Sequence, residues 1–145
     1  MNLQDKKVLL FGKGWLGCDI LRQLLSWDAD VTVISESHRY FEPDLRAFTY
    51  QKKLPLYIDD YPNHIEDFDI CISAYYSRMI PARFYNNLTV GSINIHPSLL
   101  PDYKGYSSLT WAMANGEKKT GISFHELTDK FDQGKVYYQE ELDIH

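Results

Sequence analysis

An asparagine and a histidine at the end of one apolar run are well suited to act on a carbonyl group. Asn94 and His96 flank Ile95 in GSINIHP, a run that predicts a strand over 91–97. Because strand side chains alternate, the carboxamide and the imidazole point the same way while Ile95 turns into the core. The amide can donate a hydrogen bond to a developing oxyanion, and the imidazole can donate or shuttle a proton near neutral pH. Taken alone, the pair also fits a capped strand end without chemistry.

A glycine-rich turn near the N-terminus is the second feature that could hold a ligand. Gly12, Gly14 and Gly17 follow an apolar run and open a predicted helix. Glycines in that position let backbone amides and a helix N-terminus approach a phosphate. Glu36 ends the next predicted strand, where an acid that binds a ribose would stand. The loop therefore predicts a dinucleotide site; a tight turn without ligand, or a cradle for the anionic tail of a substrate, are the alternatives.

Alternating strands and helices are predicted to position both features. Amphipathic spacing predicts a helix over about 15–27, and Ser107 or Ser108 can cap another that ends at Asn115-Gly116. Short β-branched or alternating runs predict strands over 7–11, 30–35, 69–74 and 91–97 and in GISFHEL and GKVYYQEEL. This order predicts an α/β fold, with a Rossmann-like, mostly parallel sheet and helices on both faces. Ligands bind such sheets at the carboxyl ends of the strands.

The segment from His38 to Pro62 is rich in tyrosine and charge and gives the weakest pattern. A short strand is predicted near Phe48–Tyr50, and a helix around Asp59–Asp67. Pro81 fits the first turn of a further helix, where its missing N–H costs nothing.

Length and composition restrict the class of protein. The 145 residues are 44% hydrophobic and 24% charged, which is typical of one globular domain. The net charge of −5 argues against a protein that coats nucleic acid or binds a membrane through a polybasic surface. Cys18 and Cys71 form no ligand-spaced cluster, and the first residues predict neither a signal peptide nor a membrane span. We therefore predict a small cytoplasmic domain with buried thiols and no metal, nucleic acid or membrane partner.

Four segments of the second half together resemble the folate-dependent formyltransferases. They are NIHPSLLPDYKG, WAMANGE, TGISFH and DQGKV, which follow one another within about Asp69 to Leu142. The family includes the glycinamide ribonucleotide, methionyl-tRNA and amino-sugar formyltransferases. Upstream, SAYYSRMIP is similar to the family's loop around the pterin ring.

The resemblance implies a catalytic set of Asn94, His96 and Asp132, with 10-formyltetrahydrofolate as the formyl donor. In the implied reaction a neutral amine attacks the formyl carbon and a tetrahedral oxyanion forms. Asn94 and protonated His96 stabilise that oxyanion, and Asp132 supports the imidazolium and helps relay the proton. No metal is required.

The resemblance also implies where the two ligands bind. Backbone groups of Arg78 and Ile80 would read the pterin edge and Met79 would lie along the folate, although Met79 and Ile80 could equally fill the core. The amine substrate and its phosphate would then face Gly12, Lys13 and Gly14. His125, seven residues before Asp132, either supports the site or has no role. Lys104 stands where the family usually has arginine, which puts a bidentate contact there in doubt.

Two questions of function remain open at this level. The acceptor is predicted to be a small-molecule amine on a nucleotide-linked amino sugar, with glycinamide ribonucleotide as the alternative. The methionyl-tRNA branch fits less well, because the acidic balance disfavours tRNA. A NAD-binding Rossmann module built on GKGWLG and Glu36 is the alternative of a different class, and it leaves the second half of the chain unexplained.

The resemblance also changes what the length of 145 residues implies about the chain. Residues 1–145 are expected to form the catalytic core of a formyltransferase, C-terminally truncated relative to the family. We therefore expect an exposed apolar sheet face near the C-terminus, which a homodimer or a further segment would cover.

Overall fold

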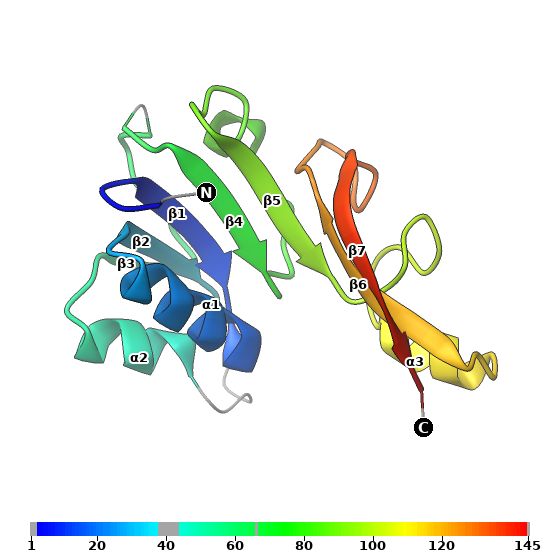
Figure 1. The fold of residues 1–145 in the computed structure, drawn as a ribbon. Coiled ribbons are helices and arrows are strands. Elements are labelled where there is room, and N and C mark those ends of the chain that lie inside the picture. The colour runs from blue at the N-terminus through cyan, green and yellow to red at the C-terminus, as the bar shows by residue number, and fades with distance from the viewer. Residues whose placement is uncertain (1–2, 38–43, 66, 145) are drawn as a thin grey trace. The chain divides into compact units, whose positions relative to one another are not determined.

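The computed structural model describes residues 3–37, 44–65 and 67–144 (Figure 1). The chain divides into two compact units, Met1–Gly91 and Ser92–His145. Among the residues described, no helix has both the length and the apolar character needed to cross a bilayer.

The N-terminal unit is a parallel sheet that carries two helices. Its strands lie in the order β3-β2-β1-β4, with the bounds Leu56–Ile58, Asp30–Ser35, Lys7–Gly12 and Ile70–Ala74. The first helix, α1 (Gly14–Ser26), connects β1 to β2 and buries one apolar side. It contacts the second helix, α2 (Leu45–Gln51), and both lie on one face of this sheet (Figure 1). The predicted α/β fold class and the first β-α-β unit are confirmed.

Two of the three glycines in the N-terminal turn serve close packing. A Cβ atom on Gly17 would lie 2.8 Å from the Leu45 side chain, and one on Gly12 would lie 3.2 Å from the same side chain and 3.1 Å from the Ala74 carbonyl oxygen. Gly14 has a φ of +60°, which a residue with a side chain rarely adopts. Tight turning and helix packing therefore account for all three glycines.

The prediction of a strand near Phe48–Tyr50 was wrong, because these residues lie in α2. The side chain of Asp44 caps this helix by accepting the Arg46 backbone N–H at 2.9 Å. The Thr49 hydroxyl donates to the Leu45 carbonyl one turn earlier, at 2.6 Å. The cap and the burial of Leu45 outweigh the strand preference of threonine and aromatic residues.

The helix predicted around Asp59–Asp67 is also absent from the described residues of that range, which are irregular apart from isolated bends and one turn; residue 66 lies outside them. The Asp60 carboxylate accepts the backbone N–H of Tyr61 at 2.8 Å, and such local bonds compete with helix formation. Pro81 comes immediately before a short 3₁₀ turn, η1 (Ala82–Phe84), instead of opening an α-helix.

The C-terminal unit is an antiparallel arrangement with one helix. β5 (Gly91–His96) pairs with β6 (Lys119–His125), and β6 pairs with β7 (Val136–Asp143). Helix α3 (Ser108–Ala114) follows Ser107 and ends at Asn115-Gly116 as predicted, although the Ser107 side chain makes no capping bond. Every residue of β7 is exposed, including Val136, Tyr137, Tyr138 and Leu142. This confirms the predicted exposed apolar surface near the C-terminus.

Candidate functional site

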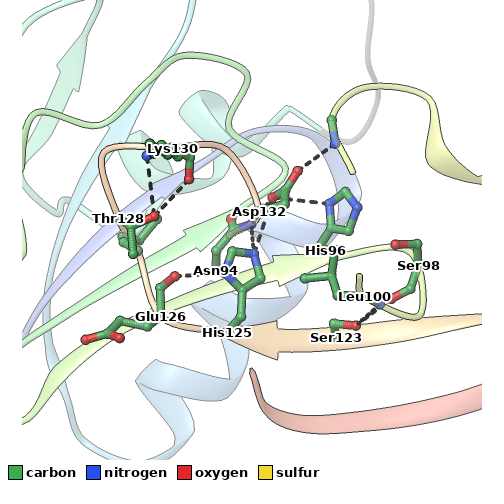
Figure 2. A network of polar contacts seen from close by, with 12 residues as sticks. Asn94, His96, Ser98, Leu100, Ser123, His125, Glu126, Thr128, Lys130 and Asp132 are labelled. Atoms are coloured by element: carbon green, nitrogen blue, oxygen red, sulfur yellow. Dashed lines mark hydrogen bonds and ion pairs between the residues drawn. The ribbon is translucent and has the colours of Figure 1, made fainter. Parts of the chain in front are cut away.

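Four polar side chains meet where β5 and β6 end. Asn94 and His96 come from the end of β5, with Ile95 between them buried in the core as predicted. Antiparallel pairing places Asn94 directly opposite His125, the last residue of β6. Asp132 lies in the loop between β6 and β7 and points toward these three side chains (Figure 2). The catalytic residues predicted from the sequence are therefore brought together, with His125 added to them.

The carboxylate of Asp132 is the centre of this cluster. Its Oδ1 atom lies 3.5 Å from His96 Nδ1 and 3.3 Å from His125 Nε2, and it accepts from Asn94 Nδ2 at 3.3 Å. Its Oδ2 atom accepts the Gly105 backbone N–H at 2.7 Å. Asp132 has a φ of +52°, a left-handed conformation that aspartate tolerates better than most residues. These contacts fix both the backbone and the carboxylate of Asp132.

His96 is held so that each ring nitrogen faces an acceptor. Its Nε2 atom lies 2.9 Å from the Tyr103 carbonyl oxygen, so this nitrogen donates. Its Nδ1 atom faces the Asp132 carboxylate. A second proton on the ring would therefore also find an acceptor.

The electrostatics of the cluster keep Asp132 ionised. Burial alone would raise the pKa of this carboxyl. Hydrogen bonds from His125 and from the Gly105 N–H, together with the charge of His96, outweigh burial and hold the pKa below its ordinary value. Asp132 therefore carries a negative charge at neutral pH, and this charge faces His96 Nδ1.

The chain that follows His96 is fixed by a buried serine. The Ser123 hydroxyl donates to the Ser98 carbonyl at 2.5 Å and accepts the Leu100 backbone N–H at 3.1 Å (Figure 2). Gln139 from β7 donates to the same hydroxyl and to the Leu100 carbonyl, both at 2.8 Å. These bonds tie the loop that supplies the Tyr103 carbonyl to β6 and β7.

The residues predicted to bind folate belong to the N-terminal unit and follow β4. The Arg78 guanidinium forms an ion pair with Asp59 at 2.5 Å. Met79 is 41% exposed, whereas Ile80 is buried. Ile80 therefore fills the core, which was one of the two alternatives for this residue, and Met79 is accessible to a ligand.

The side chain of Lys13 is engaged inside the N-terminal unit. Its Nζ atom lies 2.9 Å from Glu36 Oε2 and 2.7 Å from Ser77 Oγ. Glu36 is 4% exposed and also accepts the Ser77 backbone N–H at 3.0 Å. Burial would raise the pKa of Glu36, but the bonds from Lys13 and Ser77 lower it further than burial raises it. Glu36 is a buried counterion, and this arrangement argues against the predicted acid that binds a ribose.

His125 was named from the sequence without a definite role, although its signal was present. It stands on the predicted strand seven residues before Asp132, at the same sheet edge as Asn94. Its closeness to Asn94 depends on the register between β5 and β6, which the sequence does not specify.

Two family models match the chain. Residues 57–145 match the formyl transferase family, and residues 1–93 match a family described as putative NAD(P)-binding. GDP-perosamine N-formyltransferase of Brucella melitensis is 44% identical over 78 residues, which cover 54% of this chain and 30% of that protein. The chain thus spans less than a third of the length of this curated relative.

Solved structures share the fold at low identity. Phosphoribosylglycinamide formyltransferase from Bacillus halodurans superposes with a TM-score of 0.77 and 22% identity, over 97% of this chain and 81% of that one. The N-formyltransferase from Helicobacter canadensis was solved with folinic acid and dTDP-3-aminofucose. It superposes with a TM-score of 0.79 and 19% identity, over 96% of this chain and 53% of that one. These likenesses confirm the predicted Rossmann-like α/β fold.

Proposed function

Because the chain belongs to the formyl transferase family, we propose that it transfers a formyl group from 10-formyltetrahydrofolate to a primary amine. The observation that carries this proposal is the convergence of Asn94 and His96 on the buried carboxylate of Asp132. Amide, imidazole and carboxylate in this order supply an oxyanion donor, a proton carrier and its counterion.

In the proposed reaction the amine nitrogen attacks the formyl carbon, and a new C–N bond forms while the carbonyl electrons move onto oxygen. Asn94 and the positive charge of protonated His96 stabilise that oxyanion, and Asp132 stabilises the imidazolium. Collapse of the adduct breaks the bond to the folate nitrogen, which takes up a proton as the former amine loses one. A single oxyanion donor contributes about 10²–10³ in rate, and a positioned acid or base about 10²–10⁴.

The enzymatic test measures release of tetrahydrofolate from 10-formyltetrahydrofolate in the presence of candidate amines. We expect turnover with one amine, lost in His96→Ala and kept in His64→Ala, which removes an exposed histidine outside the cluster. Wild-type-like turnover in His96→Ala would overturn the proposed roles. Thermal stabilisation by a nicotinamide dinucleotide, with none by a folate analogue, would overturn the activity itself.

The amine we propose belongs to a nucleotide-linked amino sugar. The support is the 44% identity with the GDP-perosamine N-formyltransferase of Brucella melitensis over 78 residues. Glycinamide ribonucleotide is the second candidate, because the Bacillus halodurans enzyme shares the fold over 97% of this chain. Parallel assays with both classes of amine distinguish the two candidates. Only one class should support the release of tetrahydrofolate when the amine is present at low concentration.

We propose that folate contacts Met79 and the backbone at Arg78 and Ile80, and that the backbone at Gly12, Lys13 and Gly14 faces the amine substrate. Because the Lys13 side chain is bound to Glu36 and Ser77, the contact with the amine substrate is left to the main chain of this loop. Residues 1–145 would then form the catalytic core. Homodimer formation and a cytoplasmic location stay predictions.

A further inference from the structure

A row of polar side chains crosses the sheet of the C-terminal unit at the level of His96. His96 of β5 lies opposite Ser123 of β6, and Ser123 lies opposite Gln139 of β7. Residues that are directly opposite on neighbouring strands point to the same face of a sheet, so these three side chains share one face. Ser123 is fully buried. A hydroxyl in such a place destabilises the fold unless it is hydrogen-bonded, so its partners indicate what it does.

The Ser123 hydroxyl uses its full hydrogen-bonding capacity of one donor and two acceptor positions. It donates to the Ser98 carbonyl at 2.5 Å and accepts the Leu100 N–H at 3.1 Å (Figure 2). Its third bond comes from Gln139 Nε2 at 2.8 Å. Ser98 and Leu100 belong to the segment between β5 and α3, residues 97–107, which we call the β5–α3 loop. The Ser98 hydroxyl donates in turn to the Asp102 carbonyl at 2.7 Å, and this bond carries the constraint along the loop.

The same β5–α3 loop holds two of the proposed catalytic side chains by its backbone. The Tyr103 carbonyl accepts the hydrogen of His96 Nε2 at 2.9 Å. Two residues later, the Gly105 N–H donates to Asp132 Oδ2 at 2.7 Å. One carbonyl and one N–H of a single short segment therefore fix the imidazole and the carboxylate relative to each other. A displacement of this loop would move both contacts together.

We propose that Ser123 is a positioning residue, which holds the β5–α3 loop and, through it, His96 and Asp132 in the arrangement for formyl transfer. The inference rests on the proposed function. Gln139 supports the same loop from β7, because its Nε2 atom donates both to Ser123 Oγ and to the Leu100 carbonyl, each at 2.8 Å. A shift of about 1 Å in a catalytic group lowers a rate by about 10²-fold, so the bonds of one buried hydroxyl can control the reaction without touching the substrate.

The kinetic test removes the bonds of this row one at a time. We expect Ser123→Ala to lower kcat about 10²-fold, with the KM for 10-formyltetrahydrofolate changed less than about threefold. Gln139→Leu changes a residue of the exposed strand β7 and should lower kcat by a smaller factor, since the hydroxyl keeps its two loop partners. The matched control is Thr49→Val, which removes an equally buried hydroxyl from α2 and should keep kcat. Wild-type-like kcat in both folded variants of the row, a loss confined to KM, or an equal loss of kcat in the control would overturn the proposal.

Amide hydrogen exchange, followed by ¹H–¹⁵N NMR, tests the same inference without turnover. The Gly105 N–H is the informative proton, because Ser123→Ala leaves its acceptor Asp132 in place. Relative to the amides of β5, we expect it to exchange about tenfold faster in Ser123→Ala and at an unchanged ratio in Thr49→Val. An unchanged ratio in Ser123→Ala would overturn the proposal. Absence of turnover by the wild-type protein with every amine would instead overturn the proposed function and leave the exchange result standing.

Discussion

Replacing Asp132 by asparagine removes one negative charge at nearly constant size. The variant keeps an oxygen that can accept the Gly105 N–H, which lies 2.7 Å from Oδ2 in the wild type. It loses the charge that faces His96 Nδ1 at 3.5 Å. The Asp132→Asn protein should therefore fold, but His96 should no longer be stabilised as an imidazolium ion during the reaction.

The size of the effect follows from the distance and the burial. Two unit charges 3.5 Å apart attract by about 5 kcal/mol at an effective dielectric constant of about 20. Because about 1.4 kcal/mol corresponds to a tenfold change in rate, complete loss of this attraction would lower the rate by about 10³- to 10⁴-fold. Part of the attraction is also lost from the ground state, so we expect kcat to fall about 10³-fold, with KM little changed.

The assay follows tetrahydrofolate release under saturating donor and amine, with thermal unfolding as the check on folding. Asp129→Asn is the matched control, because it removes one exposed charge from the same loop. We expect the control to keep its activity. If a folded Asp132→Asn protein keeps kcat within about threefold of wild type, the charge of Asp132 does not support His96 and the electrostatic reasoning is wrong.

Three further predictions concern stability. Lys13→Met leaves the buried Glu36 carboxylate without its cation, so urea unfolding should show a loss of about 3–5 kcal/mol, and a loss below about 1 kcal/mol would contradict the buried pair. The folded-state pKa of Glu36 is lowered, so its stabilising contribution is complete above the unfolded pKa of about 4.3 and is lost as pH falls through the folded value. The midpoint temperature of thermal unfolding should therefore fall less steeply between about pH 5 and 3 in Glu36→Gln than in the wild type. An unchanged slope would count against this contribution of Glu36. Gly134→Ala would place a Cβ atom 1.9 Å from the Glu126 carbonyl oxygen and should cost about 3 kcal/mol or more in denaturant unfolding. The control Gly116→Ala, with open space but a φ of +75°, should cost only about 1–2 kcal/mol, and equal losses would refute the packing argument.

The strand and helix order was predictable where burial follows a simple period. The runs at β1, β2, β4 and β5 are apolar and short, and residues of these strands are buried in the sheet. Helix α2 was not predictable in this way, because its start depends on the Asp44 side chain and its burial on the space beside Gly17. A contact between segments distant in sequence decided the local structure there.

The chemistry of the cluster was predictable in type, but its geometry was not. Asn94 and His96 were paired by strand alternation, whereas the position of Asp132 depends on its own left-handed backbone inside the loop between β6 and β7. Glu36 shows the opposite case. Its place at a strand end predicts an exposed acid, yet only the three-dimensional structure reveals Lys13 and Ser77 on its two oxygens.

The exposure of β7 has a consequence for the behaviour of the protein in solution. β7 is the terminal strand in the order β5-β6-β7, so one side of its backbone is available for pairing with another strand. Exposed tyrosine and valine side chains favour such pairing, whereas the carboxylates of Glu140 and Asp143 oppose it by mutual repulsion. Salt screens this repulsion, so association of the protein through the edge of β7 should increase with ionic strength.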